Sequence, residues 1–320
     1  MNLSKGNTIG GFFELELNKG EHYHKNAVNL NLGRSCLEYI VRSTNYKTIY
    51  VPQYTCSVLF DRLAVLNINV KSYPINENLE IDIDFSEINE DALFMYTNYF
   101  GLKDDYIASI SKKIKNLIID NCQAFYSKPI KHVDSFYSPR KFFGLPDGAY
   151  LISEKVYETD LKKDTSLDRF KHLMGRIEYG PQKSFEDFKS HELKLNNEGL
   201  KAMSTLTSNM LQSIDYEKAA ERRNKNYRIL HKKLAASNML QLNFDLSLMP
   251  MVYPYLSKKE NLRSKLIGNE IFVATYWPNV LKECSVDSLE YNFAKNIIPL
   301  PIDQRYCEKD MNIIAHFILK

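Results

Sequence analysis

Between residues 28 and 152, short runs of apolar and β-branched residues alternate with stretches of helical periodicity. A short apolar run bounded by polar residues predicts a buried strand, and apolar residues three and four apart predict a helix. Helical spacing is present, for example, over Ile107–Lys115. The strands are expected at 28–32, 48–52, 69–73, 92–96, 117–120, 135–137 and 149–152. This alternation of strands and helices predicts an α/β fold with a mostly parallel, doubly wound sheet.

The pattern changes on either side of this region. The first twenty residues resemble an arm with an alternating strand at 12–17, whereas 162–197 is polar and predicts either short helices or a mobile loop. Residues 198–234 are strongly helical. After about residue 241 we expect strands at 249–256, 271–278 and 297–303 and helices at 261–268 and 311–319. We therefore expect an arm, a large domain and a smaller α+β C-terminal domain, with bounds at 1–20, 21–210 and 211–320.

Composition narrows the class of protein. The 320 residues are 44% hydrophobic and 25% charged, which is ordinary for a globular protein, and the net charge of +3 favours neither nucleic acid nor an anionic membrane. The five cysteines are odd in number and scattered, which fits free thiols in a reducing cytosol. No signal peptide and no apolar run of transmembrane length is apparent, so we expect a cytoplasmic protein.

Two clusters are expected to be structural. His22 and His24 would share one face of a strand, and without further ligands nearby a surface pair is favoured over a metal site. The basic segment 221–227 is expected to be a solvated helix face, because Glu217 and Glu221 interleave with its positive charges. No metal site is expected.

Three residues near the ends of predicted strands share a chemical use. Asp120 ends an apolar run, and Ser138 and Lys141 follow the strand at 135–137. A carboxylate can keep a pyridine nitrogen protonated, a hydroxyl can bind a phosphate, and an amine can form a Schiff base with an aldehyde. Pyridoxal phosphate combines all three groups. Each residue alone has an ordinary structural explanation, since short motifs often occur by chance.

The stretch 116–151 is similar to the lysine region of the DegT/StrS family of pyridoxal-phosphate sugar aminotransferases, which have fold type I. The family's Asp-x-x-Gln/His motif corresponds to Asp120 and Gln123, and its Ser-Phe segment, Schiff-base lysine and Gly-Gly turn correspond to 135–136, Lys141 and 148–149. The family's common spacing from its Ser-Phe segment would place the lysine at Arg140, whereas the Ser-x-x-Lys pattern selects Lys141.

The resemblance implies a three-layer large domain and further contacts to pyridoxal phosphate. Gly33, Arg34 and Ser35 lie where the family has its phosphate loop, at a predicted helix start with free backbone N–H groups, although an ordinary loop-to-helix start has the same pattern. In place of the aromatic residue that stacks on the ring, this chain has Cys56, and either a thinner neighbour or Tyr54 would serve. Asn98 takes the approximate place of a family histidine.

The resemblance further implies an aminotransferase that moves an amino group, usually from glutamate, to a nucleotide-linked keto-sugar, with surface polysaccharide synthesis as the expected setting. In that role Lys141 would hold the cofactor and carry a proton as acid and base, while Gln123 would bind the ring hydroxyl. A homodimer is expected, because the pocket of such enzymes is completed by a second subunit. Two alternatives remain open: another pyridoxal-phosphate reaction such as sugar dehydration, and a scaffold that binds no cofactor. Family dehydratases carry histidine in place of the lysine.

Overall fold

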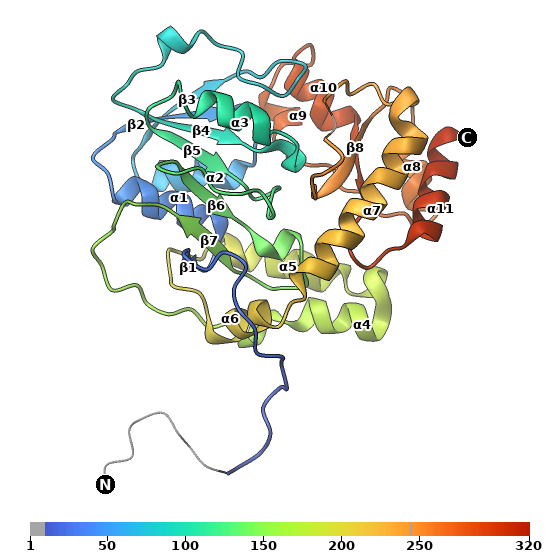
Figure 1. The fold of residues 1–320 in the computed structure, drawn as a ribbon, viewed down its shortest axis with the longest axis horizontal. Helices are drawn as coiled ribbons and strands as arrows, with labels where there is room; N and C mark the ends of the chain where they lie inside the picture. Colours follow the sequence, from blue (N-terminus) through green and yellow to red (C-terminus); the bar gives the residue numbers. More distant parts are fainter. Residues whose placement is uncertain (1–9, 244) are drawn as a thin grey trace.

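The computed structural model describes residues 10–243 and 245–320. Within them, a seven-stranded sheet with helices on both faces is joined to a smaller part built on a two-stranded sheet (Figure 1). The strands of the large sheet are β1 (Val28–Leu30), β2 (Thr48–Pro52), β3 (Asn69–Tyr73), β4 (Leu93–Thr97), β5 (Leu117–Asp120), β6 (Asp134–Tyr137) and β7 (Ala149–Ile152). All seven predicted strands of this region are present, with ends shifted by up to two residues.

The sheet has the order β1-β7-β6-β5-β4-β2-β3, and the five strands from β3 to β6 run parallel. Only β7 pairs antiparallel, to β6 on one side and to β1 on the other. The carboxyl ends of β2, β4, β5 and β6 therefore lie along one edge of the sheet, where open α/β sheets bind ligands. The predicted mostly parallel sheet is confirmed.

Both faces of the sheet are buried, which explains why its strands are apolar without a clear alternation. In β4, Leu93 and Met95 pack into one core with α1 (Gly33–Arg42) and α2 (Ser57–Val65). Phe94 and Tyr96 point to the other core, which also receives α3 (Asp104–Ile110). That second core continues without interruption into the smaller part of the molecule.

The second half of the described chain is mainly helical. Ser204 and Asp215 begin two of its helices as N-caps, because their side-chain oxygens accept hydrogen bonds from backbone N–H groups of the first turn. The helices are α4 (Lys171–Lys183), α5 (Phe185–Asn196), α6 (Thr205–Gln212), α7 (Tyr216–Leu234), α8 (Leu262–Gly268), α9 (Val280–Glu283), α10 (Leu289–Asn296) and α11 (Glu308–Leu319). The small antiparallel sheet pairs β8 (Val252–Leu256) with β9 (Ile297–Pro301). None of the described helices is long and apolar enough to cross a membrane.

Three predictions of secondary structure need correction. The described residues form no strand over 12–17 or 271–278. An alternating pattern predicts which side chains are buried, and Val273 and Trp277 are indeed buried. A strand also needs a neighbouring strand to pair with, and neither segment has one among the described residues. The continuous helical segment predicted over 198–234 is two helices that start only at Thr205. Of the two alternatives for 162–197, short helices are correct.

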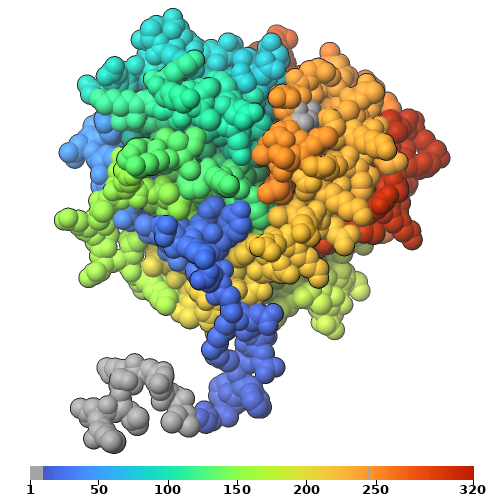
Figure 2. All heavy atoms as spheres, viewed as in Figure 1, coloured from blue at the N-terminus to red at the C-terminus, as the bar shows by residue number. Residues whose placement is uncertain are grey.

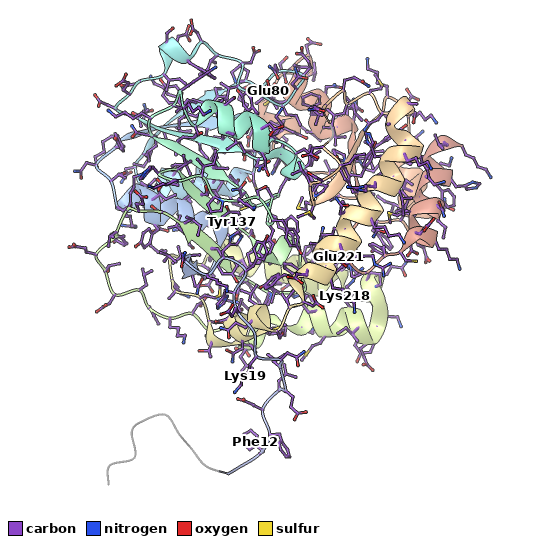
Figure 3. The ribbon with its side chains drawn as sticks, viewed as in Figure 1. Phe12, Lys19, Glu80, Tyr137, Lys218 and Glu221 are labelled. Carbon is purple, nitrogen blue, oxygen red and sulfur yellow. The ribbon has the colours of Figure 1, made fainter. Side chains whose placement is uncertain are left out.

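The described part of the arm runs past α6 (Figure 1) and projects from the body (Figure 2). Phe12 (Figure 3) is almost fully exposed, and so is Phe13. The arm contacts the body through His22 and His24. The prediction that these two histidines form a surface pair is wrong. His22 bonds to the Tyr150 hydroxyl at 2.7 Å, and His24 is buried with its ring centroid 3.9 Å from that of Tyr137.

The buried His24 makes stability depend on pH. Its Nε2 donates to the Phe125 carbonyl at 3.0 Å, and burial lowers its pKa from 6.5 to about 4. The unfolded chain therefore binds more protons, so stability is complete above about pH 6.5 and falls as the pH decreases toward 4. We expect the free energy of unfolding, measured by urea denaturation, to drop by about 2 kcal/mol from pH 7 to pH 5 through this residue. His24→Gln keeps a donor and should remove that part of the slope, whereas the exposed His316→Gln should not; equal slopes would contradict the assignment.

Candidate active site

Asp120 stands at the centre of the carboxyl edge of the sheet. It is the last residue of β5, is buried, and accepts a hydrogen bond on Oδ1 from the Cys122 amide at 2.8 Å. Its backbone carbonyl accepts from the Asn98 amide, which ties the end of β4 to the end of β5. A carboxylate with one oxygen satisfied by a local amide keeps its other oxygen available for a partner.

The N-terminus of α1 lies against this edge. Its N-cap, Leu32, offers no side-chain acceptor, so the first N–H groups of the helix have no capping partner. An added Cβ at Gly33 would lie 3.0 Å from the Cys122 sulfur, so a side chain there would require the thiol to shift. The Ser35 hydroxyl in the same turn is fully buried and has no hydrogen-bond partner. A polar group in this situation fits an anion placed at the helix start.

Lys141 and Arg140 leave the same short 3₁₀ turn, Pro139–Lys141, which Ser138 begins. Arg140 forms a bidentate ion pair with Glu192 of α5, at 2.6 and 2.9 Å. Lys141 is exposed, and its ammonium has no hydrogen bond or ion pair with the described residues. Burial and the charge of Asp120 raise the pKa of the Cys122 thiol, and the charge of Lys141 acts on the same thiol in the opposite direction. Lys141 follows the carboxyl end of β6, the strand next to β5, so Lys141 and Asp120 lie at the same edge of the sheet.

Tyr54 and Cys56 are placed differently. Tyr54 is fully buried against the smaller part, with its ring centroid 4.4 Å from that of Trp277, so it lies within the core. Cys56 is half-buried at the N-terminus of α2, and its thiol interacts electrostatically with Arg34. Of these two residues, therefore, only Cys56 is partly accessible.

Two predicted polar residues are already occupied by bonds within the chain. Gln123 accepts the Phe100 amide at 2.8 Å on its side-chain oxygen, which supports the left-handed backbone of Phe100. The Asn98 amide nitrogen donates to the carboxylate of Asp104 at 2.7 Å and to Asn121 at 2.9 Å. Their oxygens and nitrogens thus hold the loops around Asp120 in place.

Helix α5 lies in the segment 162–197, where the sequence predicted no site residue. It supports the site from outside. Besides Glu192, it provides His191, whose Nε2 donates to the Pro146 carbonyl at 2.7 Å in the loop after Lys141. The next residue, Asp147, is buried and accepts from Thr207 at 2.5 Å and from Arg169 at 2.6 Å. Gly148 completes the turn with φ +105°, where a Cβ would approach the Thr207 methyl to 2.9 Å. Of these supporting residues, only Gly148 was indicated by the sequence, as part of the predicted turn.

Arg223 fastens the same loop from the side of the smaller part. It was predicted to lie on a solvated helix face, but it is the largest fully buried side chain of the described residues. Its guanidinium donates to the carbonyls of Phe142 and Met251 and to Gln304, at 3.0 to 3.1 Å, and lies 4.6 Å from the Phe142 ring centroid. Burial lowers its pKa to about 10. No carboxylate lies within ion-pair distance of it in the described residues.

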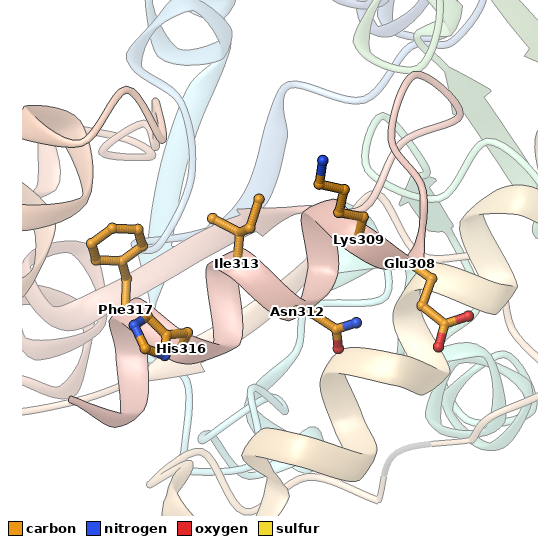
Figure 4. A pocket seen from close by; sticks show the side chains of 6 residues that line it. All are labelled: Glu308, Lys309, Asn312, Ile313, His316 and Phe317. Carbon is orange, nitrogen blue, oxygen red and sulfur yellow. The ribbon is translucent and has the colours of Figure 1, made fainter.

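The surface of α11 carries a hollow lined by Glu308, Lys309, Asn312, Ile313, His316 and Phe317 (Figure 4). It lies on one outer face of a single helix, away from the carboxyl edge of the sheet (Figure 1). It contains none of the predicted site residues.

No family model and no curated protein matches the sequence. Solved structures do match. The fold is that of the sugar aminotransferases. DesV of S. venezuelae is 15% identical, with a TM-score of 0.64 over 91% of this chain and 83% of that one. A DegT DnrJ EryC1 StrS aminotransferase from Brucella abortus is 13% identical, with a TM-score of 0.60 over 92% and 85%.

A third match has a different activity. The GDP-4-keto-6-deoxy-D-mannose-3-dehydratase of E. coli, solved with hydrated pyridoxal phosphate, is 15% identical, with a TM-score of 0.59 over 91% of this chain and 87% of that one. The predicted fold type is therefore confirmed over nearly the whole chain. At these identities the comparison establishes the fold, and the chemistry has to be argued from the residues.

Replacing Arg223 tests how much its buried hydrogen bonds contribute to the stability of the protein. Arg223→Met should lower the free energy of unfolding by about 2–4 kcal/mol, because the Met251 carbonyl and the Gln304 side-chain oxygen lose this donor and the Phe142 carbonyl keeps only the one from Gln304. The neighbouring and exposed Arg222→Met is the matched control and should change it by less than about 0.5 kcal/mol. Both are measured by urea denaturation. Equal effects would mean that the buried guanidinium contributes nothing particular to stability.

Proposed function

We propose that this protein is a pyridoxal-phosphate-dependent aminotransferase that acts on a keto-sugar, with glutamate as the expected amino donor and the sugar linked to a nucleotide. The observation that carries the proposal is the juxtaposition of buried Asp120, the uncapped start of α1 with its unpartnered Ser35 hydroxyl, and the unpaired Lys141 at one sheet edge. The fold matches support it, since several of them are sugar aminotransferases. The five free thiols are consistent with a cytosolic enzyme.

The residues fit the cofactor in three places. When bound, pyridoxal phosphate supplies an aldehyde and a ring that withdraws electrons. The phosphate would take the N–H groups of Gly33 and Arg34 and the hydroxyl of Ser35, which otherwise lacks a partner. Ser138 is a further candidate donor at the start of the lysine turn. The free carboxylate oxygen of Asp120 would hold the proton on the ring nitrogen.

The reaction needs a group that moves a proton between two carbons. Lys141 is suited to this role because its ammonium is not bound to another side chain, while the residues on either side of it are fixed by Glu192 and Arg223. Arg140 is not suited, since a guanidinium stays protonated at any working pH. Lys141 would therefore both hold the cofactor and act as acid and base.

Labelling separates Lys141 from every other lysine. Borohydride fixes the cofactor covalently to the amine that holds it, and peptide mass mapping should then find the label on Lys141. In Lys141→Ala the label should disappear and turnover should fall by roughly 10²–10⁴-fold. Arg140→Lys is informative as well, because it places a second amine at the neighbouring position; a label that moves to residue 140 would contradict our assignment. Colourless wild-type protein, unlabelled after incubation with cofactor, would exclude the whole proposal.

A sugar dehydration is the second candidate. It is favoured by Cys56, which leaves the cofactor ring without an aromatic neighbour. Mass spectrometry of the sugar product distinguishes the two reactions, because the aminotransferase leaves the nitrogen of glutamate on the sugar, whereas a dehydratase removes a hydroxyl as water and leaves no nitrogen on it.

We further propose a C2 homodimer in which the arm and the α4–α5 region contact the partner. Apolar side chains are exposed in both places: Phe12, Phe13 and Leu15 on the arm, and Met174, Ile177, Tyr179 and Leu193 on the helices. Exposed apolar groups of this extent mark interaction surfaces. Light scattering at micromolar concentration should give twice the chain mass of 37.3 kDa. Ile177→Glu should shift the protein to monomers, and Val156→Glu, also exposed but outside both places, should not.

A further inference from the structure

Three arginines from three different elements converge on one short segment at the end of α5. Arg140 pairs with Glu192. Arg34 of α1 donates to the Asn196 side chain at 3.2 Å and to the Leu195 carbonyl at 3.0 Å. Arg62 of α2 donates to the Glu198 carbonyl at 2.5 Å. Because Glu192 and Asn196 are one helical turn apart, the guanidiniums of Arg140 and Arg34 lie along the same face of α5.

The charges of this cluster do not balance. Glu192 is engaged by both nitrogens of Arg140, and Glu38 pairs with Arg42 at 2.8 Å and with Arg62 at 3.4 Å. Arg34 has only neutral acceptors, and no carboxylate of the described residues lies within ion-pair distance of it. Burial and then the charges of Arg140 and Arg62 lower the pKa of Arg34. A positive charge with this surplus around it binds an anion readily.

Arg34 is also accessible. It is half-buried, as are Arg140 and Cys56, and Lys141 beside them is exposed, whereas Asp120 and Ser35 lie deeper. Part of the Arg34 side chain is therefore open to solvent, whereas the Ser35 hydroxyl in the same turn of α1 is buried. The backbone of Gly33 to Ser35 and the side chain of Arg34 can thus serve two different anions.

We propose that the side chain of Arg34, held against α5 beside the Arg140–Glu192 pair, binds an anionic group of the substrate, a carboxylate or a phosphate. The proposal rests on the proposed function, in which both substrates carry such groups: the amino donor has carboxylates and a nucleotide-linked sugar has a diphosphate. A planar guanidinium presents two parallel donors to either group. The bonds to Asn196 and Leu195 fix its orientation before the substrate arrives.

Titration calorimetry with two unreactive probes tests this. Glutarate represents the dicarboxylate of the donor, and uridine diphosphate represents the nucleotide of the sugar. The cofactor-loaded protein should bind at least one of them, and Arg34→Gln should weaken that binding about 10–100-fold, the loss expected for a charge-assisted pair. The probe that is affected identifies which substrate Arg34 contacts. Arg42→Gln, on the same helix but at its far end, is the control and should bind as the wild type does.

Further variants separate this role from a structural one. Arg34→Lys keeps the charge and should recover part of the lost affinity. Asn196→Ala leaves the charge in place but frees one nitrogen of Arg34, and a loss of about 2–5-fold is expected from the lost orientation. This variant also serves as the test if Arg34→Gln does not fold.

The inference is overturned if neither probe binds the wild-type protein, if both bind Arg34→Gln unchanged, or if Arg34→Gln loses cofactor affinity to the same degree as probe affinity. The last result would assign the guanidinium to the cofactor's phosphate. Repeating the titrations on protein without cofactor keeps this inference separate from the proposed function. The absorbance of the cofactor tests the proposed function, and the heat of anion binding tests this inference.

Discussion

The buried guanidinium of Arg223 is the constraint on which the arrangement of the site depends. A cation in this environment is costly unless its donors are satisfied, and here the acceptors come from three separate segments: Phe142 beside the lysine turn, Met251 before β8, and Gln304 after β9. These segments can satisfy it only when the smaller part is seated against the large sheet. The position of the two parts and the position of the lysine turn are therefore determined together.

The turn is held from its other side by a different kind of bond. Arg140 is fixed to Glu192, and Asp147 is enclosed by the hydroxyls and the guanidinium that it accepts from. Lys141 is thus an exposed side chain without a hydrogen bond or ion pair in the described residues, on a backbone that is held on both sides. A backbone held in this way matters for any reacting group that it carries, since misplacement by about 1 Å can cost a hundredfold in rate.

The sequence predicted the central sheet well because its strands are buried on both faces, so that continuous apolar runs such as Leu117–Asp120 and Ala149–Ile152 are unmistakable. It failed where the decisive partner is distant. The segment 271–278 has a strand pattern but no strand beside it, and Glu192 pairs with a residue 52 positions away. Arg223 resembled a solvated residue because its charged neighbours are solvated, and local sequence carries no information on three carbonyls from other segments.

The same reasoning bears on the ambiguity between Arg140 and Lys141. Family spacing from Ser135 selects Arg140, whereas the Ser-x-x-Lys pattern selects Lys141. Residues 139–141 form a 3₁₀ turn, in which successive side chains point about 120° apart, so the two neighbours do not share a direction. The guanidinium of Arg140 is tied to Glu192 of α5, whereas the ammonium of Lys141 has no hydrogen bond or ion pair with the described residues. The two side chains therefore differ in their bonds as well as in their chemistry, since a guanidinium stays protonated at any working pH and an amine does not.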